Sequence, residues 1–427
     1  MSEEKGVTES SPVSAITDEH LARRAWNPHD PYNWPSIRKI SVALIVSLGQ
    51  LVTLMSTSMM AAALTQIGAD LHLSSTATQI TFSIFILGLA FAPFLIEALS
   101  EMYGRRSIWI ASNLFYILWN AICPVNSSVG LMTVGRFLAG SGASAGITLT
   151  GPILADMYRP EHRCYSPALL REKAALQRRN DSNAVPQSKR TFMLDKAFYQ
   201  DLGTRLGANL IRPLWLLVYR PAIQVIALIM ALNFAIYCLL LSTYATLWIE
   251  RYGESETISS LNYIAIAIGT IAASQVGGAL MDWIYRALKE RHNGETTPEF
   301  RVPFLIPGVI LIPVGIFLYG WSAEKRLTWI IVDVGTAIFV WGSFMLAQGM
   351  MAYLLDEFEH AASANAAARM LSNILGFVFP IFAPSMYASL GYGWANSVLG
   401  FIFVAVGLPI PILLWVYGPR LRAIGRT

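Results

Sequence analysis

Ten long apolar runs separated by polar segments dominate the pattern of this chain. Each run approaches or exceeds the roughly 20 residues that an α-helix needs to cross the hydrocarbon of a bilayer. Helices are expected rather than open strands, because a spanning segment must satisfy its own backbone hydrogen bonds. The predicted spans are 40–64, 80–99, 108–125, 129–155, 223–248, 261–281, 302–321, 327–355, 367–390 and 394–417.

One long polar interruption, from Asp156 to Arg220, divides the ten runs into four and six. No run inside it is long enough to cross a membrane. The pattern therefore predicts five regions. They are an N-terminal tail (1–39), an incomplete N-terminal transmembrane half (40–156), a central loop (157–222), a C-terminal transmembrane half (223–417) and a C-terminal tail (418–427).

Composition supports an integral membrane protein, since 54% of the residues are hydrophobic and only 14% are charged. Of the 31 lysines and arginines, 26 fall in the tails and loops that share one side if both termini are cytoplasmic. The net charge of +4 therefore indicates membrane orientation and not nucleic-acid binding. The histidines lie outside the apolar runs and the three cysteines match no metal-site spacing, so no metal site is expected.

An internal repeat relates the two predicted halves. LSEMYGRR follows the second run and LMDWIYRA follows the sixth, so that Glu101 and Asp282 each precede an arginine by four residues. The fourth and eighth runs end in acids of matching position, Asp156 and Asp356. Runs 1 to 4 thus align with runs 5 to 8, which is the parallel duplication of a two-halved secondary transporter.

Several motifs resemble the major facilitator superfamily, specifically its fungal branch of drug/proton antiporters. They are NPHDPYNWP at 27–35, LSEMYGRR, GRFLAGSGASAG at 135–146, DMYRPEHR and YLLDEFEHAASANAA. The resemblance implies an all-α integral membrane protein, a two-halved helix bundle in the plasma membrane. It also implies efflux of a small amphipathic molecule such as a secondary metabolite, toxin or drug, driven by the proton gradient without a bound cofactor.

The chain departs from this family at the junction of Arg163 and Cys164. Family members continue here with two more spans before the central loop, whereas this chain passes directly to YSPALLREK. Two spans and their loops take roughly 50 residues or more. We therefore expect about ten transmembrane helices, four plus six, instead of twelve.

The residues around the repeat form a predicted conformational latch at the cytoplasmic ends of the helices. Gly104 permits a tight turn, and Arg105 can pair with Asp156. The alternative interpretation is a positively charged inner loop without a specific role. The candidate latch residues are Glu101, Gly104, Arg105, Arg106, Asp156, Arg163, Asp282 and Arg286.

Two charged residues fall inside predicted spans, where a charge costs a few kcal/mol and is seldom left facing lipid. We expect Arg136 and Asp333, which we treat as partners under the repeat, to line a central cavity from opposite halves. Asp333 is the candidate for proton coupling, and the alternative is that it reaches the outer interface. Asn233, Tyr237 and Gln348 are candidate substrate contacts, although packing is the default for such positions. The small residues at 139–146 are expected to pack helices together.

The leading hypothesis is a proton-coupled efflux transporter that works as a monomer in the lipid bilayer on a small molecule. One alternative is a polyamine or nutrient importer of the same superfamily. Another is a transport-dead membrane protein or a fragmentary gene model, because the absent spans would expose cavity surface to lipid. An enzyme is not expected, since no histidine cluster or nucleophile and base pair stands out within the spans.

Overall fold

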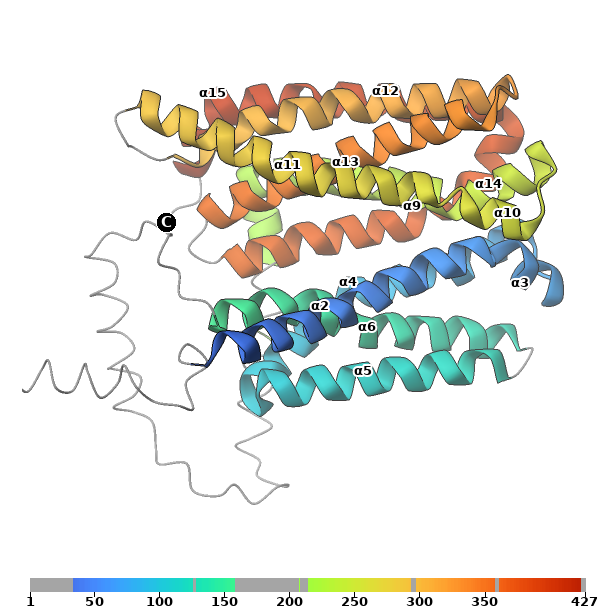
Figure 1. The fold of residues 1–427 in the computed structure, drawn as a ribbon, viewed down its shortest axis with the longest axis horizontal. Helices are drawn as coiled ribbons and strands as arrows, with labels where there is room; N and C mark the ends of the chain where they lie inside the picture. The colour runs from blue at the N-terminus through green and yellow to red at the C-terminus, as the bar shows by residue number, and fades with distance from the viewer. Residues whose placement is uncertain are drawn as a thin grey trace, which may run out of the picture. The chain divides into compact units, whose positions relative to one another are not determined.

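The computed structural model describes residues 34–125, 128–157, 207, 214–292, 297–357 and 361–423. Within these residues every regular element is a helix and no strand occurs, so the predicted all-α class is confirmed for this part of the chain (Figure 1).

Most of the predicted apolar runs lie within helices, although several helices extend beyond the run, as α11 does by ten residues at its end. The elements are α2 (Ser36–Ala62), α3 (Leu64–Asp70), α4 (Ser75–Tyr103), α5 (Arg105–Ile122), η2 (Cys123–Val125), α6 (Val129–Met157), α9 (Pro221–Thr246), η3 (Leu247–Arg251), α10 (Glu256–Leu261), α11 (Ile264–Arg291), η4 (Pro298–Phe304), α12 (Leu305–Glu324), α13 (Trp329–Glu357), α14 (Ala361–Gly407) and α15 (Pro409–Ala423).

Seven of the described segments are long and apolar enough to cross a membrane. One of them, Ala364–Leu421, has 58 residues, about twice the length of a single crossing. It contains Gly391, whose φ of 71° and ψ of 171° interrupt α14 between two helical stretches. The total of ten spans stays a prediction.

The last predicted span, 394–417, differs from the structure. It was expected as one helix, but α14 ends at Gly407 and α15 begins at Pro409. Pro409 and Pro411 have no backbone N–H to donate to the preceding turn, which explains why the helix cannot run through this point.

Contacts divide the chain into two compact units, 1–51 with 146–198 and 52–145 with 199–427. In the second unit α9 lies at the centre of the largest apolar core, with residues such as Ile223, Leu239 and Trp248 buried. Helix α14 packs along α9, α4 and α12, while α13 packs between α11 and α12, beside which it runs in Figure 1.

Two equivalent glycines support the internal repeat. The shift that relates Glu101 to Asp282 also relates Gly88 of α4 to Gly269 of α11. A Cβ atom on Gly88 would meet Phe137 O of α6, and a Cβ atom on Gly269 would lie 2.6 Å from Ala337 O of α13. Phe137 and Ala337 are themselves equivalent by the shift that relates Asp156 to Asp356. The pairs α4/α6 and α11/α13 are thus built alike.

The predicted packing role of residues 139–146 is confirmed. A Cβ atom on Gly140 would meet Phe85 O of α4, and one on Gly142 would lie 2.9 Å from Ser112 O of α5. These small residues allow three helices to approach at backbone distance.

Candidate functional site

Asp333 is held against the buried face of α9. It is the fifth residue of α13, and its Oδ1 accepts a hydrogen bond of 2.7 Å from the hydroxyl of Tyr244. Tyr244 is completely buried and has edge-to-face ring contacts with Trp248 and Tyr263. The carboxylate is therefore joined to the protein interior rather than directed only toward the membrane interface.

The Tyr244 hydroxyl has a second acceptor. The backbone oxygen of Asn262, in the connection between α10 and α11, lies 3.2 Å from it. The side chain of Asn262 in turn donates to Glu254 Oε2 at 2.8 Å. A hydroxyl carries one proton, so Tyr244 can donate to Asp333 or to Asn262 but not fully to both.

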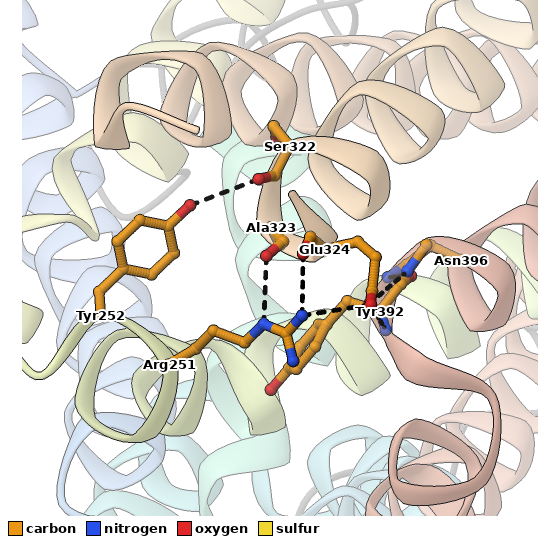
Figure 2. Close-up of polar contacts among 8 residues, drawn as sticks. Arg251, Tyr252, Ser322, Ala323, Glu324, Tyr392 and Asn396 are labelled. Atoms are coloured by element: carbon orange, nitrogen blue, oxygen red, sulfur yellow. Dashed lines mark hydrogen bonds and ion pairs between the residues drawn. The ribbon is translucent and has the colours of Figure 1, made fainter. Parts of the chain in front are cut away.

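A separate polar cluster ties together the ends of three helices, and Figure 2 shows it centred on Arg251. Arg251 Nε donates to Ala323 O at 3.3 Å, and its Nη2 donates to Glu324 O at 2.9 Å. The same Nη2 lies 3.2 Å from Glu324 Oε1. Tyr252 donates to Leu327 O at 2.9 Å. Both partners of the ion pair are partly exposed, so its direct contribution is about 1 kcal/mol or less.

Glu324 also caps the helical stretch that follows Gly391. Its Oε2 accepts the backbone N–H of Tyr392 at 2.8 Å and that of Gly393 at 3.3 Å. A carboxylate is favourable there because the first N–H groups of a helix have no partner within the helix. A side chain at Gly391 would collide with Glu324, since a Cβ atom would lie 2.8 Å from Oε2. Figure 2 shows Glu324 between Arg251 and Tyr392.

Arg136 of α6 is buried among residues of the predicted N-terminal half. Its guanidinium carbon lies 5.0 Å from the ring centre of Phe85. Within the described residues its Nε has no hydrogen-bond partner. No hydrogen bond or ion pair joins Arg136 to Asp333 among these residues, and the repeat register places Thr336 rather than Asp333 at the position equivalent to Arg136.

Two of the three substrate candidates lie together. Asn233 of α9 is buried and donates to Ser343 O of α13 at 3.2 Å, leaving its Oδ1 without a partner within the described residues. Tyr237, one turn further along α9, has a ring contact with Phe344 at 5.9 Å. Gln348 of α13 instead lies beside α11, 3.1 Å from the position of a Cβ atom on Gly277.

Two side-chain amides connect α4 to the C-terminal helices. Gln79 Nε2 lies 3.4 Å from Ser242 O of α9, and Asn373 Nδ2 of α14 donates to Leu89 O at 3.1 Å. These contacts join the two predicted halves. An alternating-access movement of one half against the other must break or rearrange them.

The predicted latch residues lie in three different settings. Gly104, with φ of 85°, separates α4 from α5, where Arg105 and Arg106 begin the next helix. Asp282 and Arg286 are exposed within α11, which continues to Arg291. The backbones of Glu101 and Asp156 lie near the ends of α4 and α6, and Arg163 lies outside the described residues.

Sequence reasoning missed Tyr244, Glu254, Arg251 and Glu324. Tyr244 is one of 17 tyrosines in an aromatic-rich chain, so its hydroxyl carried no signal of its own. Arg251 is one of only three lysines and arginines that fall on the predicted outer side, together with Lys325 and Arg326. That rarity, together with Glu324 at the end of another run, was the available clue.

Comparison with known proteins identifies the family. A sequence profile described as Major Facilitator Superfamily matches residues 46–170 and 167–380. A protein named as a probable efflux pump, mfs2 of Aspergillus flavus, is 33% identical over 419 residues, covering 85% of this chain and 98% of the relative. Efflux pump vrtL of Penicillium aethiopicum is 32% identical over 457 residues, covering 94% and 89%.

One alignment also bears on the length of the chain. An uncharacterized transporter of Schizosaccharomyces pombe is 33% identical over 455 positions, which take in 93% of this chain and 92% of the relative. Because 93% of 427 residues is about 397, about 58 aligned positions of the relative have no counterpart here. The two profile matches meet at 167–170, a few residues beyond the junction of Arg163 and Cys164.

Solved structures share the fold at low sequence identity. The xylose transporter XylE from E. coli, in a partially occluded inward open conformation, superposes with a TM-score of 0.56 at 16% identity, covering 89% of this chain and 98% of that one. The human organic anion transporter MFSD10 gives a TM-score of 0.53 at 13% identity, covering 88% and 100%. These relatives and neighbours are transporters and not enzymes. The chain belongs to the Major Facilitator Superfamily and is a multi-pass membrane transporter.

Proposed function

We propose that this transporter exports a small amphipathic molecule in exchange for protons, with Asp333 as the proton-carrying group. The observation that carries the proposal is the 2.7 Å hydrogen bond between Asp333 and the buried Tyr244 hydroxyl. The relatives named as efflux pumps support the direction of transport. The compound itself stays open, because a fold does not specify its cargo.

The two acceptors of Tyr244 suggest how protonation is linked to helix contacts. When Asp333 is ionised, it can only accept, and the Tyr244 proton is directed at it. When Asp333 is protonated, it can donate to the Tyr244 oxygen, which leaves the tyrosine proton for the Asn262 carbonyl 3.2 Å away. Protonation of Asp333 on α13 would thereby strengthen the hydrogen bond from Tyr244 of α9 to Asn262 in the α10–α11 connection.

The architecture completes the proposal. We infer ten spans, four plus six, with both termini in the cytoplasm of a plasma-membrane protein, and no resident cofactor. The unmatched positions in the S. pombe alignment and the meeting point of the two profile matches support a gap near Arg163. Asn233 and Tyr237 are the best-placed side chains for cargo, since both lie at the contact between α9 and α13.

Proteoliposomes test the coupling. The purified chain is reconstituted, and uptake of a fluorescent amphipathic dye such as ethidium is followed with and without an imposed pH gradient. We expect Asp333→Asn to reduce pH-driven dye transport to the level of empty liposomes while dye exchange without a gradient persists. Glu256→Gln, an exposed carboxylate at the start of α10, is the matched control and should behave as the native chain.

The alternatives give different results in the same vesicles. An Asp333→Asn protein that stays fully pH-coupled would reject the assignment of the proton carrier. Dye or polyamine movement in the opposite direction in inverted membrane vesicles would indicate an importer. No substrate-dependent proton flux in the native chain, in correctly folded protein, would indicate a transport-dead membrane protein.

A further inference from the structure

Helix α11 carries a continuous stripe of side chains that nothing in the described structure covers. Positions spaced by three or four residues share one helix face. On this face Ile264 is 57% exposed and Ile271 is 61% exposed. The stripe is also exposed at Ile268, Gln275, Asp282 and Arg286.

Three positions of the equivalent stripe of α4 are buried. The shift that relates Glu101 to Asp282 places Ser83, Ala90 and Phe94 opposite Ile264, Ile271 and Gln275. These three residues of α4 are only 0%, 2% and 3% exposed. They lie away from the side of α4 that holds Phe85 and Gly88, which α6 contacts.

The difference follows from what packs on each helix. Helix α14, from the C-terminal part of the chain, packs along α4. Its first half follows the eighth predicted span, so it corresponds to a fifth span of its half. Between Met157 and Pro221 the sequence holds no apolar run of spanning length that could provide an equivalent helix for α11.

One feature of the stripe is unfavourable against lipid alone, and a second feature would let another helix approach closely. Gln275 lies near the middle of α11, where an amide in hydrocarbon needs hydrogen-bond partners. Gly278, one turn further, has no atom within 4 Å of the position of a Cβ atom. A glycine in open space beside a polar side chain permits another helix to approach closely and to bond the amide.

The stripe is complementary to itself. A glutamine amide is both donor and acceptor, so two copies of Gln275 facing each other can form hydrogen bonds in both directions. One turn beyond Gly278 the stripe carries opposite charges on Asp282 and Arg286. Neither residue takes part in the ion pairs that occur within the described residues. In a two-fold pair of parallel helices each acid can meet the arginine of the other copy.

We propose that a second copy of this chain docks on the α11 stripe, and that the transporter is a two-fold symmetric dimer in the membrane. Two copies of α11 cross near Gly278, with Gln275 of each copy bonded to that of its partner. This dimer replaces the monomer expected from sequence. It does not depend on the direction or coupling of transport.

Disulfide cross-linking in native membranes tests the contact. Ile271→Cys and Gln275→Cys are each introduced into the full chain, and membranes are treated with copper phenanthroline. We expect disulfide-linked dimers for both variants. The matched control is Leu114→Cys on α5, where the leucine is 61% exposed but lies outside the stripe. It should form no disulfide-linked dimer and should run, like the native chain, as a single chain on a denaturing gel.

Subunit counting by single-molecule photobleaching adds a readout that does not need cysteine. The native chain should show two bleaching steps, and Gln275→Leu should lower the association constant about 3- to 30-fold, the range measured for polar contacts between membrane helices. Single-step bleaching of the native chain together with no cross-linking at 271 or 275 would overturn the dimer. Cross-linking of either position to a chain of different mass would do so as well.

Discussion

Helices α4 and α11 occupy equivalent positions in the internal repeat, yet they differ in where they end and in which helices pack on their outer faces. Both have a glycine in the seam against the next helix, Gly88 in one and Gly269 in the other. Helix α4 ends at Tyr103, just before Gly104, whereas α11 has Tyr285 at the position of that glycine and continues to Arg291. Both helix pairs have a glycine at this contact because the backbone of the neighbouring helix leaves no room for a side chain. Where each helix ends depends on a single residue, Gly104 or Tyr285. Whether its outer face is covered depends on which spans pack beside it.

The largest effect is expected at the covered face of α4. Phe94 is buried, and Phe94→Ala removes a large ring from a packed site, which costs about 3–5 kcal/mol of folding free energy. The equivalent change Gln275→Ala on exposed α11 should cost about 0.5 kcal/mol or less in the monomer. Thermal unfolding of the monomeric fraction in detergent measures both. Equal losses would show that α11 is covered within its own chain.

A smaller loss of folding free energy is expected at Gly88 and Gly269, and it should be similar in both repeats. Gly88→Ala and Gly269→Ala each place a methyl group against the backbone of the next helix. Overpacking of this kind costs about 1–3 kcal/mol. Gly130→Ala is the matched control, because only Ser128 lies near its Cβ position, at 3.8 Å. A tolerated Gly269→Ala beside a damaging Gly88→Ala would contradict the equivalence of the two helix pairs.

The smallest effect is expected at the arginines of the two repeated motifs, LSEMYGRR and LMDWIYRA. We expect Arg105→Ala to reduce dye transport about 1.5- to 5-fold without loss of membrane insertion, the range of a surface ion pair worth about 0.2–1 kcal/mol. Arg286→Ala, on the uninterrupted end of α11, should change transport less. Transport rates normalised to the amount of inserted protein provide the measurement. Unchanged transport in Arg105→Ala would remove this residue from the predicted latch.

The apolar cores of most helices were readable from the sequence because a membrane span must be both apolar and about 20 residues long. Their ends were less readable, since α11 continues ten residues beyond the predicted span. Gly104 and Gly391 illustrate the limit. Each has a positive φ. The tight turn at Gly104 was predicted because this glycine lies within a recognisable motif, whereas nothing in the sequence marked the turn at Gly391. The break before Pro409 also escaped prediction, since proline is common inside membrane helices and rarely marks their ends there.

The candidate site was predicted in part. Asp333 was found because a carboxylate inside a span is rare, but its partner Tyr244 lies 89 positions earlier and has no sequence signal. The expectation that Arg136 and Asp333 line one cavity as partners under the repeat illustrates the same limit, because the repeat register relates Arg136 to Thr336 and not to Asp333. Side-chain direction depends on which neighbours pack nearby, and Phe85 lies beside Arg136.

The contact between Glu324 and the backbone of Tyr392 and Gly393 has a consequence for biosynthesis. A chain is made from its N-terminus, so α9 and α12 enter the membrane before residues 391–393 exist. Until those residues are made, the Glu324 carboxylate lacks the N–H groups that it later accepts. This contact can form only after residues 391–393 have been made, so it marks a chain whose synthesis has passed the first helical stretch of α14.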